Sequence, residues 1–230
     1  MGEGLRVKIC GLTRREDVAA ADRAGADYIG VLLSAGFGRS VDLRGVAELV
    51  AGTRARKVAV LVDETPQAAA EAATALGADV LQLHGAEDPG VLRALRARGA
   101  WTLWKAVRAR SLDDVQRTVE EYGNVADALL VEGWKEGSLG VGGARLGLDP
   151  ARVRALIPGG LDFVLAGGLG PETVADAVVA FRPDVVDVSS GVELEMGVKD
   201  HALVEAFVRA ARRAAERGAA DTHSAAGGAA

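Results

Sequence analysis

A single cysteine stands at a position where chemistry is expected. Cys10 closes an apolar run over residues 6–10 and is followed by Gly11. A thiolate is a reactive group, but a lone cysteine is also commonly a small buried apolar residue. Lys8 is expected to face away from Cys10, so that no lowering of the thiol pKa by this lysine is assumed. The surroundings of Cys10 therefore leave a reactive and a structural role open.

A carboxyl group closes another apolar run. Glu132 follows Ala128-Leu129-Leu130-Val131 and is the only acidic side chain at the expected end of that strand. In a covered pocket its pKa could be raised far enough for it to act as a general acid. The alternative is a solvated residue at the start of a loop, and the sequence does not separate the two.

Three further polar side chains follow apolar runs. Arg39 lies in Gly36-Phe37-Gly38-Arg39-Ser40, where its guanidinium could bind a carboxylate through two hydrogen bonds or remain exposed. Gln82 and His84 end the run over 79–83 and are either pocket residues or part of a turn. The three histidines show no metal-binding spacing, and one cysteine cannot form a cysteine-based zinc cluster, so no metal site is predicted.

Glycines and hydroxyl groups close the last two apolar runs. These residues are Gly167, Gly168, Ser189, Ser190 and Gly191, and Asp187 stands beside them in the last run. Glycines let backbone N–H groups approach an anion, and nearby hydroxyls add donors, so this pattern predicts a phosphate site. The alternative is that the glycines only form turns.

Eight short apolar runs alternate with segments of helical periodicity, which indicates repeated βα units and a mainly parallel sheet. The expected strands are 6–10, 27–33, 57–62, 79–83, 101–107, 127–132, 162–166 and 184–188. The expected helices are 14–24, 43–52, 66–76, 88–98, 111–121, 150–156, 171–180 and 201–217. Thr13 and Glu16 are expected to form a capping box at the first helix.

A weak internal repeat supports this count. Glycine, alanine and aspartate, or close relatives, precede an apolar run at four places, and the aspartates are Asp27, Asp79, Asp127 and Asp184. Their spacing fits a βαβα unit present four times. The pattern favours a single-domain (β/α)8 barrel, an α/β fold, over a doubly wound sheet. In such a barrel the strand ends named above share one face, which carries the active site.

Composition excludes several classes of protein. The chain has 230 residues, of which 49% are hydrophobic and 26% charged, with a formal net charge of −5. This is typical of a globular protein and disfavours nucleic-acid binding. No signal peptide or membrane span is expected, and one cysteine fits a cytoplasmic location. Residues 1–217 are expected to form the barrel domain, 218–230 a disordered tail and 133–149 a functional loop.

Together these segments resemble one family, phosphoribosylanthranilate isomerase of tryptophan biosynthesis. The matching segments, in family order, are 7–11, 25–27, 39–41, 82–85, 105–107, 166–169, 186–193 and 199–200. The resemblance implies a (β/α)8 barrel that converts N-(5'-phosphoribosyl)anthranilate into an open-chain deoxyribulose phosphate by an Amadori rearrangement, without a metal or organic cofactor. It implies a small phosphoribosyl substrate as the ligand and leaves monomer or homodimer open.

The resemblance also assigns roles. It places the family's general base on Cys10, whereas the family's acid, an aspartate ending the sixth strand, falls on Glu132. Arg39 would bind the anthranilate carboxylate. The phosphate would lie among Gly168, Asp187, Ser189, Ser190 and Gly191, with the backbone of Asp187 rather than its carboxylate taking part, and Gln82 and His84 would shape the pocket.

Two departures from the family pattern leave alternatives. Glutamate in place of aspartate moves the carboxyl by about 1 Å, which can cost roughly a hundredfold in rate where geometry is tight. Ala144 and Arg145 alter a glycine-rich family loop. One alternative is therefore a paralogue that rearranges a different aminoaldose phosphate. Another is a barrel that binds a phosphosugar without turning it over.

Overall fold

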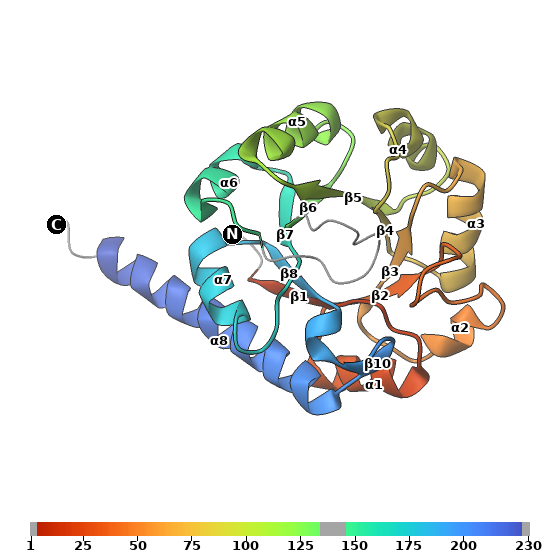
Figure 1. Ribbon diagram of the computed structural model, residues 1–230, viewed down its shortest axis with the longest axis horizontal. Coiled ribbons are helices and arrows are strands. Elements are labelled where there is room, and N and C mark those ends of the chain that lie inside the picture. Colours follow the sequence, from red (N-terminus) through yellow and green to blue (C-terminus); the bar gives the residue numbers. More distant parts are fainter. Residues whose placement is uncertain (1–3, 134–145, 227–230) are drawn as a thin grey trace.

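Eight parallel strands close into a barrel, and a helix follows each strand on the outside (Figure 1). The computed structural model describes residues 4–133 and 146–226. The barrel strands are β1 Arg6–Ile9, β2 Tyr28–Leu32, β3 Arg56–Leu61, β4 Val80–Leu83, β5 Thr102–Ala109, β6 Ala128–Gly133, β7 Asp162–Leu165 and β8 Val185–Val188. The helices are α1 Arg15–Ala24, α2 Val46–Leu49, α3 Pro66–Leu76, α4 Pro89–Arg96, α5 Leu112–Tyr122, α6 Pro150–Leu156, α7 Val174–Phe181 and α8 His201–Ala226. The predicted single-domain (β/α)8 fold is confirmed, and the doubly wound alternative was wrong.

The repeated aspartates have one structural task in common. Each precedes an even-numbered strand, and its carboxylate accepts a hydrogen bond from a backbone N–H of the preceding odd-numbered strand. The four bonds join Asp27 to Val7, Asp79 to Lys57, Asp127 to Leu103 and Asp184 to Phe163, at 2.6, 2.7, 2.7 and 2.8 Å. The fourfold repeat therefore marks the point where the strands of each βαβα unit are joined side to side.

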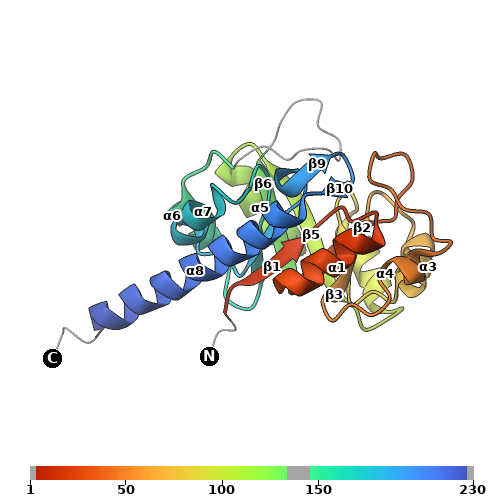
Figure 2. The same cartoon turned by 90° about the horizontal axis from the view of Figure 1, so that it is seen from below.

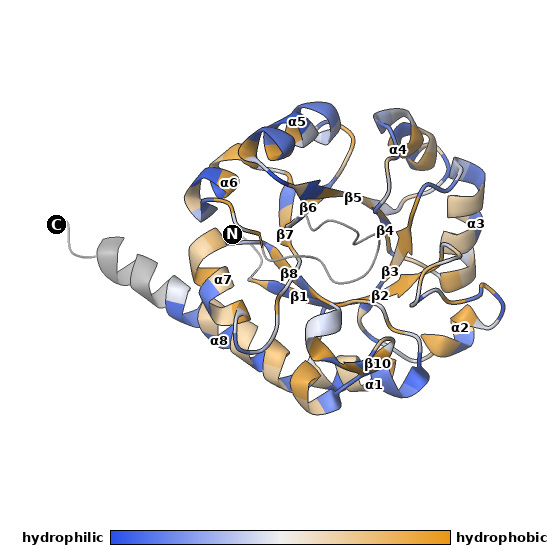
Figure 3. Cartoon of the chain, viewed as in Figure 1, coloured by the Kyte–Doolittle hydropathy of each residue, from blue (hydrophilic) through white to orange (hydrophobic). Residues whose placement is uncertain are grey.

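Alternation along the strands creates two cores. One set of side chains fills the barrel, including Tyr28, Val58, Trp104 and Leu130. The other set packs outward against the helices, whose hydrophilic residues lie on the outer side, as helix α5 shows in Figure 3. Side chains two residues apart in a strand share a face. A strand that places apolar side chains inside the barrel therefore also places its last inward side chain at the rim formed by the carboxyl ends of the strands.

Helix starts were predicted with mixed success. Pro66, Pro150 and Pro171 were each expected to begin a helix. Pro66 and Pro150 are the first residues of α3 and α6 and follow capping residues whose side chains accept backbone hydrogen bonds. Pro171 is not the first residue of its helix, since α7 begins at Val174. The capping box of Thr13 and Glu16 was wrong. No side chain caps α1; the Thr13 hydroxyl instead donates to the Gly197 carbonyl oxygen at 2.6 Å.

The chain ends with a small hairpin and a long helix. Strands β9 (Glu193–Glu195) and β10 (Val198–Lys199) pair antiparallel beside the barrel rim, after a 3-10 turn at Ser190–Val192. Helix α8 crosses the flank of the barrel and extends beyond it (Figure 2). It continues past residue 217 to Ala226, a segment in which alanine, the strongest helix former, is frequent. The assignment of 1–217 as the barrel domain and 218–230 as a disordered tail stays a prediction.

Candidate active site

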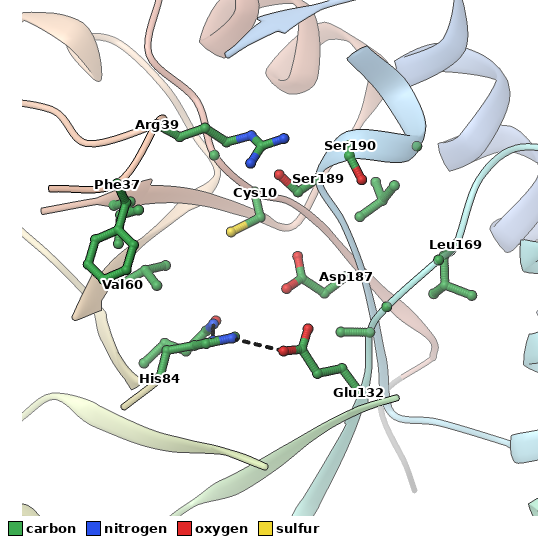
Figure 4. Close-up of a pocket in the computed structure, with 18 of the residues that line it drawn as sticks. Cys10, Phe37, Arg39, Val60, His84, Glu132, Leu169, Asp187, Ser189 and Ser190 are labelled. Carbon is green, nitrogen blue, oxygen red and sulfur yellow. Dashed lines mark hydrogen bonds and ion pairs between the residues drawn. The ribbon is translucent and has the colours of Figure 1, made fainter. Parts of the chain in front are cut away.

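A pocket opens at the carboxyl ends of the barrel strands. Its lining includes every residue that the sequence analysis selected for the site: Cys10, Arg39, Gln82, His84, Glu132, Gly167, Gly168, Asp187, Ser189, Ser190 and Gly191. Figure 4 shows Cys10, Asp187 and Glu132 directed into this pocket, with Phe37 and Val60 on one wall. The strand ends therefore bring together residues from all eight barrel units.

The thiol of Cys10 lies beside a buried ion pair. Lys8 is 0% exposed, and its Nζ lies 2.9 Å from Oδ2 of Asp187. Burial raises the pKa of Cys10 above its ordinary value, the charge and a hydrogen bond of Lys8 oppose this rise, and Asp187 adds to it. Gly30 leaves the room for this arrangement, since a Cβ there would lie 2.8 Å from the Cys10 sulfur and 3.1 Å from the Lys8 Nζ.

One expectation about this group was wrong. Lys8 was expected to face away from Cys10, but residues two apart in a strand point to the same side, and both side chains enter the barrel. That the backbone of Asp187 rather than its carboxylate takes part in binding phosphate stays a prediction, and the structure gives the position of the carboxylate. It points into the pocket, where Oδ1 is buried without a hydrogen-bond partner among the described residues.

Glu132 is buried at the rim and held by two donors. Its Oε1 lies 2.9 Å from Nε of Arg108, on β5, and 3.2 Å from Nε2 of His84, after β4. Burial raises the pKa of the Glu132 carboxyl, but the hydrogen bonds and charges of His84 and Arg108 outweigh it and bring the pKa below its ordinary value of 4.5. The sequence left a raised pKa of Glu132 open, and the structure gives the opposite direction, because Arg108 on the neighbouring strand β5 and His84 after β4 both face the carboxyl.

A glutamine fixes the histidine ring. Nε2 of Gln82 lies 2.8 Å from Nδ1 of His84. If the amide donates to Nδ1, the neutral ring carries its proton on Nε2 and donates it to Glu132. Both residues therefore do more than shape the pocket wall, since they orient the carboxyl of Glu132.

Arg39 is held by an acidic residue outside the predicted set. Its Nε and Nη2 donate to the two oxygens of Glu193 at 2.8 and 2.6 Å. Glu193 also accepts from Nζ of Lys199 at 2.8 Å. Burial raises the pKa of Glu193, but the hydrogen bonds from Arg39 and Lys199 lower it overall. The guanidinium is thereby fixed in orientation on the upper wall of the pocket (Figure 4).

The backbones of the loops after β7 and β8 lie close together and form the pocket wall where a phosphate is expected. A Cβ on Gly191 would lie 1.9 Å from the Leu169 carbonyl oxygen, so only glycine fits there. Gly167 and Gly168 have φ angles of +87° and +62°, which favour glycine. The loops after β7 and β8 therefore lie against each other in the way that the glycine pattern predicted.

Sequence reasoning missed four charged residues of the site: Lys8, Arg108, Glu193 and Lys199. Strand alternation could have found two of them. Lys8 lies two residues before Cys10, and Arg108 is the register partner of Glu132 on the neighbouring strand. Lys105, which closes the fifth apolar run, faces the other way and pairs with Glu87 at 2.8 Å outside the pocket.

The described residues place limits on other kinds of site. Within residues 4–133 and 146–226, no group of three or more His, Cys, Asp or Glu side chains is arranged to hold a metal ion. No helix in this part of the chain is long and apolar enough to cross a membrane. Most of the predicted functional loop, including Gly142, Gly143, Ala144 and Arg145, lies outside the described residues.

Comparison with known proteins gives a consistent result. The family model for N-(5'-phosphoribosyl)anthranilate isomerase matches residues 7–210. The N-(5'-phosphoribosyl)anthranilate isomerase of Afipia carboxidovorans is 39% identical over 213 residues, covering 91% of this chain and 90% of that protein.

Solved structures agree with the sequence matches. The phosphoribosyl anthranilate isomerase of Thermotoga maritima superposes with a TM-score of 0.81 at 29% identity, covering 91% of this chain and 99% of that one. A phosphoribosyl anthranilate isomerase solved in complex with reduced 1-(o-carboxyphenylamino)-1-deoxyribulose 5-phosphate has a TM-score of 0.77, the same identity and the same coverage. The barrel, its pocket and these matches agree, and the chain belongs to the N-(5'-phosphoribosyl)anthranilate isomerase family.

Proposed function

We propose that this protein isomerises N-(5'-phosphoribosyl)anthranilate to 1-(2-carboxyphenylamino)-1-deoxyribulose 5-phosphate, with Cys10 as general base and Glu132 as general acid. One observation carries the assignment of these two roles. The thiol and the carboxyl, distant in sequence, line one pocket whose remaining wall is formed by the glycine loops after β7 and β8. Membership of the family supports the same reaction.

The reaction needs one proton donor and one proton acceptor. Glu132 gives its proton to the oxygen of the furanose ring as the bond from that oxygen to C1 breaks, and the lone pair of the anilino nitrogen forms a C1=N double bond. The thiolate of Cys10 then takes the proton from C2. The electrons of that C–H bond form a C1=C2 double bond, and the nitrogen regains its lone pair. The resulting enol becomes the ketone when C1 gains a proton and the C2 hydroxyl loses one.

The pKa directions define the resting state of the pair. The raised pKa of Cys10 and the lowered pKa of Glu132 favour a protonated thiol beside an ionised carboxyl at neutral pH. The enzyme is in this same state after the two proton transfers, because Glu132 has then lost its proton and Cys10 has gained one. The active form carries the same total number of protons, with the proton on Glu132 instead. Substrate anions and exclusion of water both raise the pKa of a carboxyl, which favours the active form in the complex.

Arg39 is assigned to the anthranilate carboxylate. Because Glu193 occupies the Nε side of the guanidinium, the end formed by the two terminal nitrogens is the side that a substrate carboxylate would take. Gly167, Gly168, Ser189, Ser190 and Gly191 are assigned to the phosphate, where backbone N–H groups and hydroxyls supply donors.

Several sequence predictions stay predictions. They are a cytoplasmic location, the absence of a cofactor, and a small phosphoribosyl molecule as the binding partner, without nucleic acid or membrane. Whether the protein works as a monomer or a homodimer stays open. The acid–base steps above do not require a cofactor.

The direct test is a steady-state assay with freshly generated N-(5'-phosphoribosyl)anthranilate, following the loss of its fluorescence. Wild-type turnover is expected, with kcat/KM reduced about a hundredfold or more in both Cys10→Ser and Glu132→Gln, since each removes a proton-transfer group. A Cys10→Ser enzyme within about threefold of the wild type would show that the base is misassigned.

The same purified protein separates the alternatives. Absence of turnover by a folded protein that binds a phosphorylated product analogue would favour the paralogue or the silent barrel. Complementation of a tryptophan auxotroph adds an independent result, because a paralogue acting on another aminoaldose phosphate should fail to restore growth.

A further inference from the structure

The carboxyl of Glu132 is held through only one of its oxygens. Arg108 Nε donates to Oε1 at 2.9 Å, and His84 Nε2 lies 3.2 Å from the same atom. Arg108 and Glu132 are register partners on β5 and β6, so their side chains leave the sheet on the same face. The contact between them is therefore fixed by the sheet and not by a loop.

The second oxygen has a different environment. Within the described part of the chain no hydrogen bond to Oε2 is found, and Figure 4 shows this atom directed into the pocket, on the side of Asp187. Oε1 therefore fixes the carboxyl, while Oε2 is the atom presented to a bound molecule.

A glutamate needs such support more than an aspartate does. The side chain has one more rotatable bond than the aspartate that the family resemblance implies, and each free torsion spreads the carboxyl over several positions. A displacement of about 1 Å is enough to cost roughly a hundredfold in rate where reacting groups must be aligned. The contacts of Oε1 with Arg108 Nε and His84 Nε2 restrict the carboxyl to a single position.

The charges around Glu132 come from four strands. Arg108 on β5 and His84 after β4 face it directly. Asp187 on β8 lies across the pocket (Figure 4), and its buried partner Lys8 on β1 has its Nζ 2.9 Å from Oδ2 of Asp187. Removal of Arg108 leaves the buried carboxyl of Glu132 with His84 as its one side-chain partner among the described residues.

We propose that Arg108 is the positioning residue that lets a glutamate act as the acid at this site, by fixing Oε1 and leaving Oε2 to face the sugar ring oxygen. This inference rests on the proposed function, since it assumes that Glu132 donates the proton. Arg108 acts through Glu132 and not on the substrate. Its importance should therefore depend on the length of the acidic side chain.

The test is a cycle of four proteins: wild type, Arg108→Met, Glu132→Asp and the double variant, assayed for kcat and KM. Arg108→Met is expected to lower kcat about 10- to 100-fold with KM changed less than about threefold, because alignment and not binding is lost. Glu132→Asp is expected to lower kcat as well, since the shorter carboxyl no longer reaches Arg108. Adding Arg108→Met to Glu132→Asp should then lower kcat by less than about a further threefold. The effects of the two substitutions on kcat would thus depart clearly from additivity.

The pH profile supplies a readout that a purely structural role would not move. Without Arg108 the pKa of Glu132 should rise, because a hydrogen bond and a positive charge that lower it are gone. The low-pH limb of kcat/KM should therefore shift to higher pH in Arg108→Met. Arg117→Met is the matched control, because Arg117 is an exposed arginine of the next helix that pairs with Asp114 outside the pocket.

Four outcomes would overturn the inference. One is an Arg108→Met enzyme within about threefold of wild type with an unmoved low-pH limb, and another is losses that simply multiply in the double variant. If Arg108→Met does not fold, Arg108→Lys is measured instead, and activity equal to wild type in that variant would also contradict a role for the Nε donor. A wild type without turnover would overturn the proposed function itself, and this inference with it.

Discussion

The buried pair of Lys8 and Asp187 offers a sharp test of how the site is held together. Lys8 is fully buried and Asp187 is 7% exposed, with 2.9 Å between Nζ and Oδ2. Lys8→Met keeps the length and apolar stem of the side chain but leaves the carboxylate of Asp187 buried without its cation. Removing one partner of a buried pair typically costs about 3–5 kcal/mol of stability.

The expected size of the effect can be measured by thermal unfolding. For a chain of this length each kcal/mol lowers Tm by about 2–4 °C, so Lys8→Met should lose roughly 6–20 °C. Circular dichroism melts at neutral pH measure this directly. Lys57→Met is the matched control, because its pair with Asp79 is partly exposed, at 3.4 Å, and should contribute less than about 1 kcal/mol.

Substitution of Asp187, the second partner of the pair, tests the cause of the lowered Tm. If the loss comes from an unpaired buried charge, the double variant Lys8→Met with Asp187→Leu should recover much of the Tm, since both charges are then absent. A Lys8→Met protein that melts within about 2 °C of the wild type would refute the argument that this pair is energetically coupled. A double variant less stable than Lys8→Met would refute the explanation by an unpaired charge.

Three further predictions follow from the pocket. Since His84 and Arg108 hold the pKa of Glu132 below 4.5 and burial holds that of Cys10 above 9.0, kcat/KM should be flat from about pH 5.5 to pH 8. At lower pH a second proton blocks the base, and at higher pH the shared proton is lost; a limb near pH 7 in a pH–rate profile would contradict this. Gly191→Ala should lower kcat/KM roughly a hundredfold, because the added Cβ displaces the backbone wall assigned to the phosphate. Gly159→Ala should not lower it, because no atom outside its chain neighbours lies within 4 Å of a Cβ there. Equal effects of the two substitutions would contradict the steric reasoning. Arg39→Met should raise KM about 10-fold or more with a smaller change in kcat, because a carboxylate anchor remote from the reacting atoms is lost; an unchanged KM would show that Arg39 does not bind substrate.

Much of the site could be predicted because a parallel barrel collects strand ends. Once the eight apolar runs are read as strands, Cys10, Gln82, Glu132 and Asp187 must lie on one rim, since every strand runs in the same direction. The four repeated aspartates were equally readable, because each performs the same local hydrogen-bonding task in its own βαβα unit.

Pairings within the site were less predictable. Arg39 was read correctly as a pocket residue, but its partner Glu193 lies 154 positions further along the chain. Lys8 was misplaced because strand alternation was applied incorrectly, and that error could have been avoided. The partner of Lys8, Asp187, is 179 positions away and depends on closure of β1 against β8.

The sequence by itself determined the order of the elements, the barrel and the identity of the residues at its rim, because periodicity and turn chemistry act over a few neighbouring residues. Only the tertiary structure decided which charges meet and in which direction they shift each pKa. Glu132 shows the reason. Burial alone would raise its pKa, and the opposite result comes from His84 and Arg108, which the side-by-side pairing of β4, β5 and β6 brings to the same oxygen atom.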